Sequence, residues 1–132
     1  MFRDREEGGA ALARALSKYK GSDLVVYGLP RGGLVTAHVV ANALGAPLDV
    51  VITRKIGHPH QPEYAVGAIA EDGQVVLNER EVAGLSHQWI EREKQEQLRE
   101  AKRRRAVYVG GRAPLPVKGK TAIIVDDGIA TG

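Results

Sequence analysis

Two adjacent acids close to the C-terminal end of the sequence have the surroundings of a ligand site. Asp126 and Asp127 follow the aliphatic run at residues 121–125, which is typical of a buried strand. Small and glycine residues come next, and their backbone N–H groups can turn inward to bind an anion. The carboxylates suit hydroxyl groups or a divalent cation. This pattern indicates a sugar phosphate with free hydroxyls, the alternative being an ordinary strand-to-turn ending.

A second glycine loop follows the apolar run at residues 24–29. Pro30, Arg31, Gly32 and Gly33 come directly after this run and before a predicted helix. A guanidinium beside exposed glycine amides at a helix N-terminus is suited to bind an anion. An ordinary strand-to-helix turn is the alternative, because such a turn also needs glycines.

Two cations and two histidines follow the apolar run at residues 48–53. Arg54 and Lys55 come directly after it, at the edge of the predicted sheet where the other loops lie. They could meet an anionic ligand, and solvated loop charges are the alternative. Residues 54–63, which include His58 and His60, are predicted to form a loop. The sequence shows no third ligand at a suitable spacing, so we do not expect a metal at these histidines.

The elements around these motifs predict an α/β fold. Strand 24–29, helix 34–44 ending at Gly45 and strand 48–53 make a βαβ unit, whose strands are parallel. A helix over residues 4–19, capped by Asp4, precedes it. In such sheets, ligands bind at the carboxyl ends of the strands.

The middle of the chain is predicted to be an insertion. Residues 65–70 and 75–77 form a hairpin in this interpretation, turning at Asp72-Gly73. A charged surface helix begins after Asn78, is interrupted at Gly84 and continues to about residue 105, and a short strand at residues 106–109 follows.

A basic cluster ends this predicted helix, formed by Lys102, Arg103, Arg104 and Arg105. Solvated side chains on the last helical turn are the interpretation that we favour, since cations there suit the helix dipole. A nucleic-acid surface is the alternative, but no aromatic residues interleave with the cluster, so we do not expect nucleic acid as a partner.

Composition excludes several classes of protein. The 132 residues, 43% hydrophobic and 27% charged, predict one globular domain over residues 1–132 rather than a disordered chain. The lack of cysteine excludes disulfides, thiolate metal sites and cysteine nucleophiles. No apolar run approaches the roughly 20 residues of a membrane span, and the charged N-terminus is unlike a signal peptide. We therefore expect a cytoplasmic protein without a membrane partner.

The segment IIVDDGIATG at residues 123–132 closely resembles the diphosphate-sugar signature of type I phosphoribosyltransferases. The PRGG loop at residues 30–33 is similar to the loop with which this family grips pyrophosphate. The resemblance implies a Rossmann-like parallel sheet flanked by helices, with a helical and hairpin insertion that includes the charged helix at residues 78–105. In the family the signature loop runs further, so we expect the C-terminal part of the fold to be missing and the sequence to stop inside this loop.

The resemblance also implies roles for individual residues. The ribose and 5′-phosphate site would comprise Asp126, Asp127, Gly128, Ile129, Ala130, Thr131 and Gly132. The pyrophosphate site would comprise Pro30, Arg31, Gly32, Gly33, Arg54 and Lys55, with a non-proline cis peptide between Pro30 and Arg31. Catalysis would depend on Arg31, Lys55 and Asp127. Mg²⁺ would bridge pyrophosphate oxygens, and Asp126 and Asp127 would be its protein ligands, directly or indirectly.

The implied activity is transfer of a 5-phosphoribosyl group from 5-phosphoribosyl 1-pyrophosphate (PRPP) to a nitrogenous base or amine, with release of pyrophosphate. A non-catalytic regulator that binds PRPP or a nucleotide with the same fold is the alternative. Arg31 and the Arg54-Lys55 pair favour catalysis, because phosphate binding alone does not need a leaving-group clamp. The partners would be PRPP and a small-molecule acceptor, and we expect a homo-oligomer, specifically a dimer.

Overall fold

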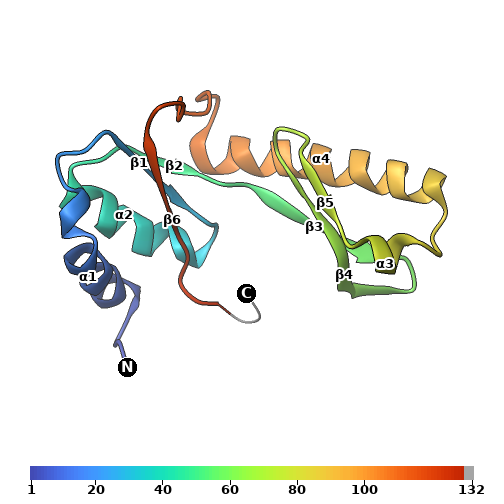
Figure 1. Cartoon of the computed structure of the whole chain (residues 1–132), viewed down its shortest axis with the longest axis horizontal. Helices are drawn as coiled ribbons and strands as arrows, with labels where there is room; N and C mark the ends of the chain where they lie inside the picture. The colour runs from blue at the N-terminus through green and yellow to red at the C-terminus, as the bar shows by residue number, and fades with distance from the viewer. Residues whose placement is uncertain (130–132) are drawn as a thin grey trace. The chain divides into compact units, whose positions relative to one another are not determined.

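The computed structural model describes residues 1–129 of the chain. They form two compact units (Figure 1). The first combines Met1–Val51 with the chain from Gly111 onward, and the second is Ile52–Gly110. The single domain expected over residues 1–132 remains a prediction.

Three parallel strands form the sheet of the first unit. The central strand is β1 (Leu24–Gly28), with β2 (Leu48–Val50) on one side and β6 (Thr121–Val125) on the other. Successive side chains of a strand point to opposite faces of the sheet, and Val25 and Val26 are both fully buried. Aliphatic residues can therefore fill both faces of β1, as in sheets of α/β proteins. The predicted parallel α/β sheet is confirmed.

Two helices complete the first unit. The helix α2 (Gly32–Leu44) packs on the sheet, and α1 (Arg5–Ala15), followed by the short 3₁₀ helix η1 (Ser17–Tyr19), packs on α2. Asp4 caps α1 as expected, because its Oδ1 accepts a hydrogen bond from the Glu7 amide at 2.8 Å. The core between α2 and the sheet is aliphatic and contains Leu24, Val26, Ala37, Val40, Ala41, Leu44 and Val125.

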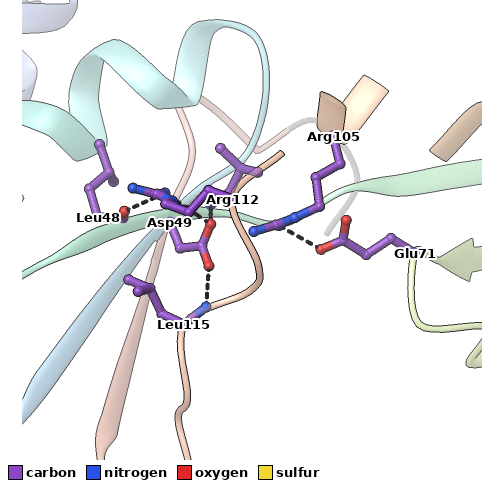
Figure 2. Close-up of polar contacts among 7 residues, drawn as sticks. Leu48, Asp49, Glu71, Arg105, Arg112 and Leu115 are labelled. Atoms are coloured by element: carbon purple, nitrogen blue, oxygen red, sulfur yellow. Dashed lines mark hydrogen bonds and ion pairs between the residues drawn. The ribbon is translucent and has the colours of Figure 1, made fainter. Parts of the chain in front are cut away.

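A buried carboxylate holds the loop that leads into β6. Asp49, on β2, is 1% exposed. Its Oδ2 accepts a hydrogen bond from the Leu115 amide at 2.8 Å, and its Oδ1 accepts one from Arg112 Nη2 at 3.3 Å (Figure 2). Arg112 also donates to the Leu48 carbonyl at 3.1 Å. Because a buried charge is tolerated only when it is paired and hydrogen-bonded, these contacts anchor the loop on β2.

The second unit is an antiparallel sheet packed against helices. Its strands, in the order β3-β4-β5, are β3 (Thr53–His58), β4 (Gln61–Ala70) and β5 (Val75–Leu77). The short helix α3 (Glu79–Val82) and the long helix α4 (His87–Val109) follow. The core of this unit contains buried Ile56, Val66 and Ile69, with partly buried Val75, Leu77, Val82, Leu85, Trp89 and Leu98 around them.

The basic cluster on α4 is largely paired within the second unit. Arg103 and Arg104 contact Glu100, and hydrogen bonds from these two guanidinium groups lower the pKa of Glu100 to about 2. Arg105 is 9% exposed, and its Nη1 donates to Glu71 Oε1 at 2.8 Å (Figure 2). The expectation that all four cations are solvated is therefore wrong for Arg105. Its long side chain reaches inward to an acid at the β4–β5 turn.

The secondary structure of three predicted segments differs from the expectation. The strand predicted over residues 48–53 ends at Val50, and Thr53 begins a strand of the other sheet. The predicted loop at residues 54–63 is instead most of the β3–β4 hairpin, in which residues of low strand propensity are held by pairing with β4. The predicted strand at residues 106–109 is the last turn of α4. The hairpin turning at Asp72-Gly73 and the helix break near Gly84 are confirmed.

Within residues 1–129, no helix has both the length and the apolar character that crossing a membrane requires.

The packing of α1 on α2 gives a stability prediction. A Cβ added at Gly9 would lie 2.8 Å from Val39 Cβ, whereas one at Gly8 would meet only Phe2, at 3.5 Å. We expect Gly9→Ala to lower the free energy of unfolding by about 1–3 kcal/mol through overpacking. Gly8→Ala should be neutral or stabilising by up to about 1 kcal/mol, because alanine favours helix. Urea unfolding followed by circular dichroism measures both, and equal effects would contradict the close helix contact.

Candidate functional site

The two motifs of the first unit that are predicted to bind anions meet at one edge of its sheet. The β1–β6 register runs from Leu24 opposite Thr121 to Gly28 opposite Val125, so the two strands end at the same level. The Leu29 amide donates to the Val125 carbonyl at 3.0 Å, which extends this pairing by one residue. The loops that follow β1 and β6 are therefore neighbours at the carboxyl ends of parallel strands, where ligands bind in open α/β sheets.

Gly32 and Gly33 let the first turn of α2 touch both acids. A Cβ at Gly32 would overlap Asp127 Oδ2, and one at Gly33 would lie 2.9 Å from Asp126 Oδ1. Neither glycine has a positive φ. These positions therefore need glycine for space and not for an unusual backbone conformation. The structure therefore brings two residues of the predicted pyrophosphate site, Gly32 and Gly33, next to two residues of the predicted ribose site, Asp126 and Asp127.

Arg31 stands at the N-cap position of α2 and its side chain is exposed. The peptide bond between Pro30 and Arg31 is cis, as the family resemblance implied. The first amides of a helix lack partners within the helix, and its N-terminus carries partial positive charge. Arg31 and the start of α2 thus concentrate positive charge beside the two carboxylates, as a ligand with both hydroxyl and phosphate groups requires.

The two carboxylates have different local partners. Asp126 Oδ1 accepts a hydrogen bond from the Asp127 amide at 2.8 Å. Asp127 Oδ2 accepts one from Arg5 Nε at 2.8 Å and lies 2.7 Å from Arg5 Nη2. The hydrogen bond from the Arg5 guanidinium lowers the pKa of Asp127 below its ordinary value. Asp127 is therefore held in the charged form, which accepts hydrogen bonds.

Arg5 is the residue of this site that the sequence analysis missed. It lies 122 positions before Asp127 in the chain, in the first turn of α1, where the sequence analysis predicted a capped helix and no site residue. No spacing rule connects these two residues. Only the packing of α1 on α2 brings the guanidinium to the sheet edge.

The predicted pyrophosphate residues Arg54 and Lys55 belong to the second unit, on β3. Arg54 Nε donates to Gln97 Oε1 at 2.9 Å, and Lys55 Nζ lies 3.2 Å from Glu63 Oε2. Both line a cavity of about 380 Å³ together with residues that include His58, Pro59, Trp89 and Glu93. Their contact with pyrophosphate stays a prediction.

Some predicted ligand positions are not characterised by the structure. Ala130, Thr131 and Gly132 lie outside the described residues, and the 5′-phosphate contacts predicted for them stay a prediction. Gly128 and Ile129 are exposed beyond the acid pair.

Over residues 1–129, no group of three or more acidic or histidine side chains is arranged to hold a metal ion. At the histidines, His58 Nδ1 accepts a hydrogen bond from the His60 amide at 3.1 Å.

This chain is similar to a family model, to two named proteins and to one solved structure. Residues 4–132 match the family model described as "Phosphoribosyl transferase domain". Two proteins from Mycobacterium tuberculosis strains CDC 1551 and H37Rv, each named "Putative phosphoribosyl transferase", are 48% identical over 134 residues. These matches cover 100% of this chain, which spans 30% of the length of each relative. The crystal structure of TT1426 from Thermus thermophilus has a TM-score of 0.79 and 42% identity, covering 96% of this chain and 61% of that one.

The contact between Gly32 and Asp127 predicts a local effect of Gly32→Ala. The added methyl would displace the Asp127 carboxylate and the Arg5 guanidinium, which are both ends of flexible side chains. We expect the amide NMR signals of Arg5, Asp127 and Gly128 to shift, while the free energy of unfolding changes by less than about 1 kcal/mol, as for a surface substitution.

Gly111→Ala is the matched control in the same unit, because nothing lies within 4 Å of a Cβ added there. Unchanged signals at Asp127 in the Gly32 variant would show that the loops do not touch.

Proposed function

Because the chain belongs to the phosphoribosyl transferase domain family, we propose that it transfers the 5-phosphoribosyl group of PRPP to a nitrogenous base or amine and releases pyrophosphate. One observation carries this proposal most directly. The first turn of α2 lies against both carboxylates that follow β6, so a glycine loop suited to an anion and an acid pair suited to hydroxyls share one sheet edge. PRPP has both kinds of group, with a phosphate and a pyrophosphate on one ribose.

The acid pair would hold the ribose. Ionised carboxylates only accept hydrogen bonds, so Asp126 and Asp127 are suited to the two ribose hydroxyls, which donate them. Both residues are exposed at the sheet edge and can be reached by a ligand. The 5′-phosphate would then lie beside the loop from Gly128 onward, whose backbone amides are its expected partners.

The glycine loop would stabilise the leaving group. In the proposed reaction the bond from C1 of the ribose to a pyrophosphate oxygen breaks, a bond from C1 to the acceptor nitrogen forms, and that nitrogen loses a proton. Negative charge grows on the departing pyrophosphate while the ribose becomes cationic. The Arg31 guanidinium and the amides of Gly32 and Gly33 would stabilise that charge, and preorganised donors of this kind give large rate effects. Arg54 and Lys55 are further candidates for this role.

The residues present fit a magnesium ion that is bound mainly through the substrate. Mg²⁺ usually takes one or two carboxylates together with substrate phosphates and water, and does not need a cage of protein ligands. Asp126 and Asp127 supply such carboxylates, and the described residues hold no larger ligand cluster. When bound, the ion would neutralise charge on the pyrophosphate oxygens.

Ligand binding tests the assignment of the acid pair. We expect calorimetry to detect PRPP binding in the presence of Mg²⁺, and Asp127→Asn to weaken it by about 10- to 100-fold, because a charged hydrogen-bond acceptor is lost. Asp72→Asn is the matched control: its Oδ1 accepts only a backbone amide in the β4–β5 turn, at 3.0 Å, which an asparagine oxygen also accepts. An absence of PRPP binding by the unchanged protein contradicts the proposal.

Turnover separates an enzyme from a regulator. Pyrophosphate release, screened over purine, pyrimidine and small amine acceptors, should appear with one acceptor class. Arg31→Gln should lower kcat/KM at least about tenfold, because a charged group that stabilises the leaving group is lost. Arg14→Gln makes the same charge change at an exposed position in the last turn of α1. PRPP binding without release for every acceptor would favour a non-catalytic regulator of the same fold.

A further inference from the structure

Arg5 contacts one oxygen of Asp127 through two nitrogen atoms of its guanidinium group. Its Nε and Nη2 lie 2.8 Å and 2.7 Å from Asp127 Oδ2. Both contacts end on the same oxygen, so Arg5 does not use Oδ1. A carboxylate fixed at one oxygen has a defined orientation and still offers the other oxygen to a ligand.

The same guanidinium also lies against the glycine loop. A Cβ at Gly32 would be 2.7 Å from Arg5 Nε and would overlap Asp127 Oδ2. Residues from the first turn of α1, the first turn of α2 and the end of β6 thus meet at this oxygen. The start of α1 is itself fixed, because Asp4 caps the helix through the Glu7 amide.

Folding stability does not account for this arrangement. The Arg5 and Asp127 side chains are 57% and 32% exposed, and ion pairs this open to solvent contribute little to stability. A cation in the first turn of a helix also opposes the helix dipole, which favours acids there. The neighbouring Glu6 and Glu7 follow that preference, and Arg5 does not. Its placement is therefore better explained by the site than by the helix.

We propose that Arg5 is a positioning residue of the PRPP site: it fixes Asp127 through Oδ2 so that Oδ1 faces a ribose hydroxyl. This role rests on the proposed function, in which Asp127 binds the ribose. It extends the site to α1, an element that the recognised motifs do not include. Arginine is required for it, because a guanidinium presents two donors in a rigid fork and an ammonium is a single flexible point charge.

A double-mutant cycle on PRPP affinity tests this role. Calorimetry with PRPP and Mg²⁺ would compare the unchanged protein with Arg5→Gln, Arg5→Lys, Asp127→Asn and the double variant Arg5→Gln with Asp127→Asn. We expect Arg5→Gln to weaken binding about tenfold, a typical size for a coupled charged pair, and Arg5→Lys to recover only part of that loss. In the Asp127→Asn background, Arg5→Gln should have less than about a twofold effect, because the carboxylate that it orients is gone.

Arg3→Gln is the matched control, since it removes the same charge two residues away. Arg3, which precedes α1, lies 3.4 Å from Glu7 of that helix, and its side chain is 85% exposed. We expect this variant to bind PRPP within about twofold of the unchanged protein, and thermal unfolding of both glutamine variants to stay close to that of the unchanged protein, as for surface substitutions.

The outcomes separate this inference from the proposed function. If the unchanged protein does not bind PRPP, the proposed function fails, and the role of Arg5 fails with it. If PRPP binds but Arg5→Gln behaves like Arg3→Gln, the positioning role alone is wrong. A full tenfold loss that persists in the Asp127→Asn background would also overturn it, because Arg5 would then act on the ligand and not through Asp127.

Discussion

The parallel pairing of β1 with β6 is the constraint on which the candidate site depends. The two strands come from opposite ends of the chain, yet their register places Gly28 opposite Val125. Since parallel strands that end at one level deliver their following loops to the same place, the glycine loop and the acid pair must be neighbours. The buried Asp49 supports this pairing indirectly, because it anchors on β2 the loop that leads into β6.

The glycine loop and the acid pair also lie close enough to each other to form one candidate site. The backbone of Gly32 and Gly33 touches the carboxylates of Asp127 and Asp126, which any larger residue would push away. Arg5 contacts Asp127 directly, and the start of α2, preceded by Arg31, adds partial positive charge beside these acids. An arrangement of adjacent acceptors and donors is suited to a ligand that carries hydroxyls and phosphates on one small sugar, and it is less suited to a simple anion.

The second unit shows how tertiary contacts change the meaning of charged residues. Arg105 belongs to a cluster that looks solvated in the sequence, but it is buried and paired with Glu71. Arg54 and Lys55 lie in a strand and not in a loop, with Gln97 and Glu63 as their partners. The sequence predicted a solvated cluster for Arg105 and a ligand-binding loop for Arg54 and Lys55, whereas each of these cations has a partner within the second unit.

The sequence by itself determined the parallel α/β sheet, the cap at Asp4, the cis peptide at Pro30–Arg31 and the two loops that define the family. The strands of the βαβ unit, the cap and the loops depend on residues close together in the chain, so local patterns could predict them, whereas the cis peptide was implied by the family resemblance. Only the tertiary structure decided that β3 pairs with β4 where a loop was expected, that Arg105 is buried, and that Arg5 contacts Asp127. These features depend on contacts between segments that are distant in the sequence. The free energy of such packing can outweigh the local secondary-structure propensity, and the spacing of residues along the chain does not reveal it.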